Sequence, residues 1–388
     1  MRAHAWSAMA ALVGLMGCSP VQEADTEGLS LAVTLGGTDT AGYARALEAR
    51  DFRFPADHGP HPDFKTEWWY VTGHLTSESG RRFGYQLTLF RSALAPSAAA
   101  SESVWSTRQA YMGHFAVSDI DGGAFYARER FARGAAGLAG ATGDPLRVWL
   151  EGWSLEGTGV GDAFPLRLTA SDDSVALELT LEPGKGIVLN GEDGLSQKSA
   201  EPGNASYYYS LPRMPTVGSL RVGSETFDVN GSSWLDREWS TSVLGKGQVG
   251  WDWFALQLDD DREVMVYRIR QADGSAAPES EGALVAQDGT KTRLAWESEI
   301  QVEDLGSWTS PDGRAAYPER WLIRIPSEGL ELELEPLLSD QELRLTFRYW
   351  EGAVSVRGTS PGGLIKGLGY VELTGYGETG RSTGVWSR

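Results

Sequence analysis

The fold is decided by two neighbouring aromatic runs, Glu67-Trp68-Trp69-Tyr70-Val71-Thr72-Gly73-His74-Leu75 and Phe83-Gly84-Tyr85-Gln86-Leu87-Thr88-Leu89-Phe90-Arg91. Both are rich in aromatic and β-branched residues, which suit a pleated sheet. A polar segment, 76–82, separates the two runs, so together they predict a β-hairpin. If Leu75 faces Phe83, one face of the hairpin is continuously apolar and Glu67 faces Arg91 at its far end. We expect an ion pair there, because a charge on an apolar face needs a partner.

The other face of this hairpin mixes rings with polar groups, including Trp68, Tyr70 and His74. Such a face is neither a plain core face nor a plain solvent face. It is compatible with the wall of a ligand pocket or with a second packed interface, and the pattern alone does not choose between them.

Composition favours an all-β chain of two domains. The chain has 388 residues, enough for two domains of ordinary size, and 48 of them are glycine, which indicates many turns. Its formal net charge of −19 argues against nucleic acid as a partner, because phosphates would be repelled.

The N-terminus has the architecture of a bacterial signal peptide. An apolar run ends at Leu15-Met16-Gly17-Cys18, which resembles a lipobox, and Cys18 is the only cysteine. We therefore expect a signal peptide at 1–17, lipidation of Cys18, and a polar tether at 18–50. This predicts a protein of the periplasm or outer membrane that contacts the membrane only through its lipid anchor. The alternative is an ordinary signal peptide with a stray cysteine.

Two passages in the second half echo the first half. The segments 250–258 and 264–270 repeat the aromatic hairpin that ends in arginine, and the expected register sets Asp252 against Arg270. The segment Trp350 to Gly358 likewise echoes Trp149 to Gly157. Two echoes in the same order indicate duplication of one β-unit. We therefore predict two similar antiparallel β-barrels in tandem, at 51–240 and 241–388.

Several of these motifs together resemble the AttH and carotenoid 1,2-hydratase family. The resemblance is carried by Glu67 to Leu75, Phe83 to Thr88, Trp234-Leu235-Asp236-Arg237-Glu238-Trp239 and Gly250 to Phe254, and it extends over 52–376. It implies two tandem lipocalin-like barrels. It also implies a large apolar substrate near the domain junction, as in carotenoid hydratases, tocopherol cyclases and lipocalin-like Diels-Alderases. The segment 234–239 lacks the histidines of the carotenoid hydratases, which argues against carotenoid hydration specifically.

The candidate catalytic residues are Asp236, Glu238 and His74. Adding water to an alkene, or cyclising a polyene, starts with a proton placed on carbon, which needs a protonated carboxylic acid in a dry pocket. Strand alternation puts Asp236 and Glu238 on one face, where two carboxyls share protons readily. The alternative is an ion-pair network of Asp236, Arg237 and Glu238 that ties the barrels together. The expected pocket rings are Trp68, Tyr70, Trp234, Trp239, Trp251 and Trp253.

No metal and no other cofactor is expected. The four histidines after Cys18 all fall in the first barrel, but His58 and His61 lie in a Gly-Pro loop where no cysteine can join them. No Gly-x-Ser-x-Gly motif is present. Two functional hypotheses follow: a protein that binds a hydrophobic molecule, isoprenoid or lipid-like, and hydrates or cyclises it by acid catalysis, or a non-catalytic lipid carrier. The resemblance further implies an association with a transporter in an export system.

Overall fold

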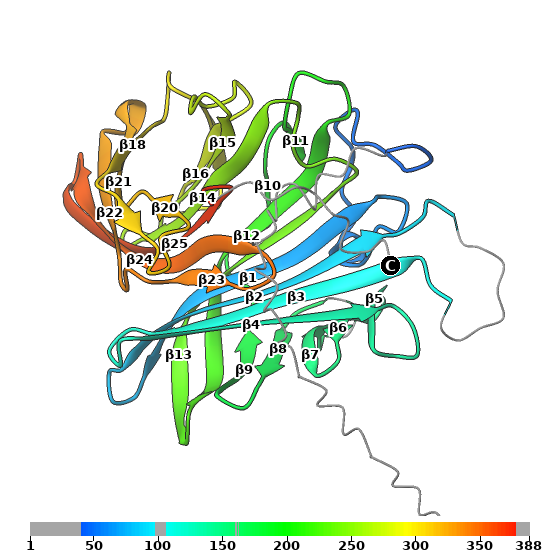
Figure 1. Cartoon of the computed structure of the whole chain (residues 1–388). Helices are drawn as coiled ribbons and strands as arrows, with labels where there is room; N and C mark the ends of the chain where they lie inside the picture. Colours follow the sequence, from blue (N-terminus) through cyan, green and yellow to red (C-terminus); the bar gives the residue numbers. More distant parts are fainter. Residues whose placement is uncertain (1–39, 98–105, 160, 162, 378–388) are drawn as a thin grey trace, which may run out of the picture.

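The computed structural model describes residues 40–97, 106–159, 161 and 163–377. The predicted signal peptide and Cys18 lie outside the described residues. Apart from two single turns of 3-10 helix, η1 (Ala56–His58) and η2 (Pro326–Glu328), the regular structure is all β. Two large sheets account for nearly all of it (Figure 1).

The first sheet is an antiparallel, nearly closed barrel. Its strands run in the order β4-β3-β2-β1-β13-β12-β9-β8-β7-β6-β5, and the short strands β10 and β11 pair with β12. Its strands are β1 (Thr66–Ser77), β2 (Arg82–Ala93), β3 (Gln109–Asp119), β4 (Ala124–Arg133), β5 (Ala139–Gly143), β6 (Leu146–Leu150), β7 (Trp153–Gly157), β8 (Leu166–Ser171), β9 (Val175–Leu181), β10 (Val188–Leu189), β11 (Leu195–Gln197), β12 (Ala205–Val222) and β13 (Glu225–Ser240).

The second sheet is a half-barrel. Its order is β17-β16-β15-β14-β25-β24-β22-β21-β18, with β23 paired to β24, and a separate pair joins β19 (Trp308–Thr309) to β20 (Ala316–Tyr317). Its strands are β14 (Gln248–Leu258), β15 (Glu263–Gln271), β16 (Glu281–Val285), β17 (Lys291–Ala295), β18 (Gln301–Leu305), β21 (Arg320–Ile325), β22 (Leu330–Pro336), β23 (Glu342–Arg344), β24 (Arg348–Ser360) and β25 (Gly363–Thr374).

The two sheets share one connectivity. In each, the first strand pairs with the strand that follows it and also with the last strand of its unit, β1 with β13 and β14 with β25. The same pairing in both units supports the duplication and confirms the predicted all-β fold of two tandem lipocalin-like barrels, the second of them open.

The register of the first hairpin is the expected one, but that of the second differs. Glu67 faces Arg91 across β1 and β2. Asp252, however, faces Arg268 rather than Arg270. The turn after β14 is tight, with Asp261 in the left-handed conformation at φ 62°. Each residue of β14 therefore pairs with a β15 residue two positions before the expected one.

The second sequence echo does not reflect equivalent structure. The stretch from Trp350 to Gly358 lies within the single strand β24. The corresponding stretch from Trp149 to Gly157 instead turns back on itself between β6 and β7, where Glu151 has a φ of 54°. The stretch from Trp149 to Gly157 is therefore part of a hairpin.

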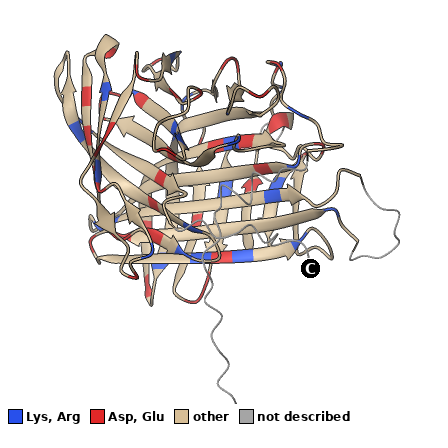
Figure 2. Ribbon diagram, turned by 45° about the horizontal axis from the view of Figure 1, so that its top comes forward, with Lys and Arg blue, Asp and Glu red and all other residues tan. Residues whose placement is uncertain are grey.

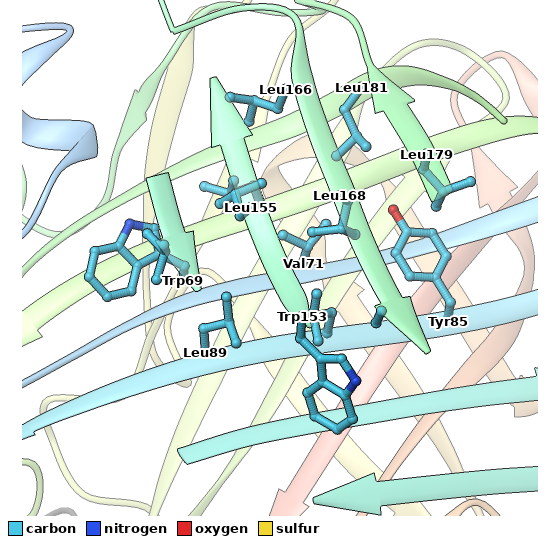
Figure 3. Packing of buried hydrophobic residues seen from close by; sticks show 14 of the residues in the cluster. Trp69, Val71, Tyr85, Leu89, Trp153, Leu155, Leu166, Leu168, Leu179 and Leu181 are labelled. Atoms are coloured by element: carbon cyan, nitrogen blue, oxygen red, sulfur yellow. The ribbon is translucent and has the colours of Figure 1, made fainter. Parts of the chain in front are cut away.

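Each barrel is filled by its own side chains. Odd-numbered residues of β1, such as Trp69 and Val71, point into the core of the first sheet, and even-numbered residues of β14, such as Phe254 and Leu256, point into that of the second. Figure 3 shows leucines of β7, β8 and β9 packed over the side chains of β1 and β2. The opposite faces of β1 and β14 are consequently left for contact between the sheets.

The two sheets meet through their outer faces. A buried cluster at this junction combines Tyr70 and Trp234 of the first sheet with Trp253, Ala353 and other residues of the second. The sheets approach closely at Gly84, because a Cβ atom placed there would lie 2.7 Å from the Cβ of Ala353. Charged residues of both signs are interspersed along the strands (Figure 2), and some of them reach this junction.

Candidate active site at the junction of the two sheets

A cavity lies between the outer faces of the two sheets. It offers a volume of about 70 Å³ to the centres of water-sized molecules, and one water needs only ~10–15 Å³ of such volume. It therefore has room for several waters or for an organic group of similar size. Six of the rings that form its walls are Trp68, Tyr70, Tyr208, Trp251, Trp253 and Tyr349.

Asp236 of β13 lies in the wall formed by the first sheet and is only 3% exposed. Its Oδ1 accepts hydrogen bonds from Ser210 Oγ (2.5 Å) and Trp234 Nε1 (2.6 Å), and its Oδ2 accepts one from the Tyr208 hydroxyl. The Tyr208 oxygen in turn accepts one from Trp253 Nε1 at 3.1 Å. Burial raises the pKa of Asp236 to about 7, although its three donors act in the opposite direction. The carboxyl thus titrates near neutral pH.

The alternative ion-pair network does not include Asp236. Arg237 points to the opposite face of β13, where it donates to Glu67 and to the carbonyl oxygen of Gly59 (2.6 Å). Glu238, on the cavity side, pairs with Lys198 at 2.9 Å and accepts a hydrogen bond from Ser206. No cation is bonded to Asp236 among the interactions that the described residues make.

Two further carboxyls line the cavity from the second sheet, and the sequence analysis did not single them out. Burial, with the charge of Glu372, raises the pKa of Glu351 on β24 well above its usual range. Burial also raises the pKa of Glu372 on β25 to about 8; the charges of Asp236 and Glu238 add to this, and a hydrogen bond from Trp251 opposes it. The sequence offers one signal for Glu351: it is the charged residue within an otherwise apolar stretch, Tyr349-Trp350-Glu351-Gly352-Ala353.

Glu67 forms a buried cluster away from the cavity. It receives bonds from Arg91 and from Arg237, and all three side chains are at most 1% exposed. Burial alone would raise the pKa of Glu67, but the two guanidinium groups hold it well below its usual range. Asp252 has the same arrangement in the second unit.

Asp252 accepts bonds from Arg268 Nε at 2.7 Å and from Arg270 Nε at 3.0 Å. Arg270 thus reaches the aspartate although it is not the residue directly opposite. These clusters tie strands together within each sheet and do not contribute to the cavity.

The expected pocket rings divide into three groups. Trp68, Tyr70, Trp251 and Trp253 line the cavity. Trp234 is not in the lining but packs in the junction cluster and donates to Asp236. Trp239 does not belong to the site, because alternation turns it into the core of the first sheet, where it stacks on the His61 ring at 3.7 Å.

His74 contacts the second sheet beside the cavity rather than within it. Its Nε2 lies 2.8 Å from the carbonyl oxygen of Gly369. Burial lowers the pKa of His74 to about 4, so the ring is neutral at pH 7 and donates this hydrogen bond. His74 therefore lies outside the lining that Asp236 and Glu238 share.

Two other kinds of site receive no support from the part of the chain that the structure describes. Over those residues, no group of three or more histidine, cysteine, aspartate or glutamate side chains is arranged to hold a metal ion. In the same ranges, no helix is long and apolar enough to cross a bilayer.

Comparison with known proteins supports the family resemblance. The AttH-like family model matches residues 45–376. An AttH protein of Nitrosomonas europaea is similar in structure, with a TM-score of 0.75 and 32% identity over 86% of this chain and 99% of that chain. No curated protein matches the chain.

Two more distant structures share the fold. Kievitone hydratase of Nectria haematococca has a TM-score of 0.64 at 16% identity, over 90% of this chain and 97% of its own. CghA, solved with Sch210972, has a TM-score of 0.50 at 12% identity, over 90% and 98%. At these identities the likeness concerns the fold alone. The family match, which spans nearly all of the described residues, shows that this chain belongs to the AttH-like family.

Proposed function

We propose that this protein binds a compact apolar molecule in the junction cavity and catalyses its hydration or cyclisation by protonating an alkene carbon. Asp236 is the proton donor. The observation that carries this proposal is a buried carboxyl that is bonded to no cation of the described residues and set in an aromatic wall, where burial raises its pKa to about 7. A general acid works best when its pKa lies near the operating pH.

The surroundings of Asp236 suit each stage of the reaction. When its proton passes to one alkene carbon, the adjacent carbon becomes a carbocation, which the faces of the surrounding indole and phenol rings stabilise. The carboxylate left behind is held by the donors on Tyr208, Ser210 and Trp234. Water, or a second alkene of the same molecule, then attacks the cation. The proton lost in the final step returns to Asp236, so the enzyme is regenerated.

The fold comparison agrees with this chemistry without specifying the substrate. One of the structures that share the fold is a hydratase. The small volume of the cavity favours a ring-sized molecule, since a long isoprenoid would require the wall side chains to move apart.

The second candidate is a non-catalytic carrier. It is favoured by the three hydrogen bonds that already occupy both oxygens of Asp236, which would suit a fixed structural carboxyl. In either case we propose an envelope protein anchored through Cys18 in the periplasm or outer membrane, and for the carrier an association with a transporter.

Deuterium exchange separates the two candidates. The purified protein is incubated in D₂O with geraniol or limonene, and the deuterium content of the recovered molecules is measured by mass spectrometry. Reversible protonation at carbon incorporates deuterium even when little product accumulates. We expect incorporation with the wild type and a loss of 10²- to 10⁴-fold with Asp236→Asn, the range typical of a general acid. Bound alkene recovered without deuterium would instead establish the carrier.

A further inference from the structure

Protonation of an alkene needs one acid, yet the wall formed by the second sheet carries two more carboxyls, Glu351 and Glu372. We propose that the molecule bound in the junction cavity carries a compact cationic amine, which lies against these two carboxyls and the rings beside them. This inference rests on the proposed function, because it names the chemical class of the substrate at the same site.

The first argument is the balance of charge in the cavity. Among the described residues, four carboxyls line it, those of Asp236, Glu238, Glu351 and Glu372, and Lys198 is the only cationic side chain that does so. Lys198 is already paired with Glu238 at 2.9 Å. Among the described residues no cation in the lining pairs with the remaining carboxyls, so these groups keep their protons, and a cation brought by a ligand would stabilise their ionised form.

The second argument is the state of Glu351. Its side chain is 1% exposed, and neither carboxyl oxygen makes a hydrogen bond of ordinary geometry to another described residue. The hydroxyls of Tyr70 and Tyr349 lie close enough to influence its pKa, but the Tyr349 hydroxyl is also bonded to His114 Nδ1 at 2.7 Å. Glu351 is thus a buried carboxyl in the cavity wall whose nearest donors are two tyrosine hydroxyls rather than a cation of the described residues, which suits it to a cationic ligand group.

The third argument is the kind of cation that the walls accept. Trp251 and Trp253 of the second sheet line the cavity together with Trp68 and Tyr70 of the first, and indole and phenol faces attract organic cations. An alkylated ammonium also buries apolar methyl groups against these rings. The amine would lie against the second sheet, which leaves Asp236 on the opposite wall free for chemistry.

This arrangement makes binding depend on pH. Without a cation beside them Glu351 and Glu372 hold their protons, and an ammonium group binds only when one of the two carboxyls ionises, so binding releases a proton. Taking the pKa of about 8 for Glu372, the fraction ionised predicts affinity about 50-fold higher at pH 8 than at pH 6. Other titratable groups face the pair from the neighbouring elements: Tyr70 on β1, Asp236 and Glu238 on β13, Tyr208 on β12, Tyr349 on β24, Tyr267 on β15 and Lys198 before β12.

Calorimetry with two matched probes tests the proposal on the wild-type protein. Choline carries a quaternary ammonium, and 3,3-dimethylbutan-1-ol has the same shape without the charge. We expect choline to bind about 50-fold more tightly at pH 8 than at pH 6. Comparison of buffers with different ionisation enthalpies should show release of about one proton at pH 6 and about half a proton at pH 8. Failure of choline to bind, or equal affinity for the neutral alcohol without proton release, would overturn the proposal.

Variants then locate the binding site. The double variant Glu351→Gln/Glu372→Gln should lose the preference for choline and the proton release, whereas Glu333→Gln, on the exposed face of β22, should retain both. If the double variant retained the preference for choline and the proton release, the proposal would be overturned. If that variant does not fold, the comparison of choline with the neutral alcohol on the wild-type protein decides the matter.

Asp236→Asn distinguishes this inference from the proposed function. The variant should still bind choline, since Asp236 lies on the other wall, while it loses deuterium exchange. Choline binding without any alkene exchange in the wild type would therefore contradict only the proposed function. Alkene exchange in a protein that does not bind choline would contradict only the inference.

Discussion

Replacing Asp236 with asparagine should raise the unfolding free energy relative to the wild type, and this gain should be larger at neutral pH than at acidic pH. The carboxyl has a pKa of about 7 in the folded chain against an ordinary 3.8. Each unit of difference corresponds to ~1.4 kcal/mol, so the folded state loses roughly 4 kcal/mol when this group ionises. Because the folded-state pKa is the higher one, stability falls as the pH rises from about 4 to 7 and is constant above 7.

Urea unfolding curves of both proteins at pH values from 4 to 8 measure this effect. The difference in unfolding free energy between variant and wild type should change by roughly 4 kcal/mol across the series, in favour of asparagine at pH 8. Titrating groups distant from Asp236 cancel, since both proteins share them. Glu333→Gln, which removes a surface partner of Arg320, should differ from the wild type by less than ~1 kcal/mol throughout.

A difference between Asp236→Asn and the wild type that stays constant from pH 4 to pH 8 would refute the reasoning. It would mean that the three hydrogen bonds to the carboxylate offset the cost of its burial completely. Asp236 would then be ionised at neutral pH and unable to serve as an acid.

Two further predictions concern the scaffold. Glu67→Gln leaves Arg91 and Arg237 buried without their anion and should lower the unfolding free energy by about 3–5 kcal/mol in urea titrations at pH 7. Because the pKa of Glu67 is lowered in the folded chain, this loss of stability should shrink as the pH falls through that pKa. A loss no greater than that of Glu333→Gln would contradict the stabilising role of the cluster. Gly84→Val should cost about 1–3 kcal/mol in thermal unfolding and disturb choline binding, because its Cβ would lie 2.7 Å from that of Ala353. Gly186→Ala, with no heavy atom within 4 Å of the added Cβ, should leave both unchanged.

The sequence predicts local pairing and the faces of strands well. The register of the first hairpin follows from alternation, because shifting it by one residue would move Trp69 and Val71 out of the core. Alternation also separates Asp236 from Arg237, which the structure shows on opposite faces of β13. The same rule places Trp239 opposite Asp236, although we expected that ring in the pocket.

The parts that the sequence did not predict depend on distant segments. Glu351 and Glu372 meet Asp236 only because β24 and β25 of the second unit pack their outer faces on the first unit. Nothing near these glutamates in the sequence reveals that contact. The register of the second hairpin depends on the length of its turn, which residue types alone do not fix, because the left-handed conformation of Asp261 helps to close that turn.

The most direct test of the account is the titration of Asp236 itself. The protein is labelled with ¹³C at the aspartate carboxyl carbons, and its NMR spectra are recorded from pH 3 to pH 9. We predict one carboxyl signal, missing in Asp236→Asn, that titrates near pH 7 and shifts when choline binds. If the signal assigned to Asp236 titrates below pH 5, the carboxyl is ionised at neutral pH and the junction cavity has lost its proposed acid.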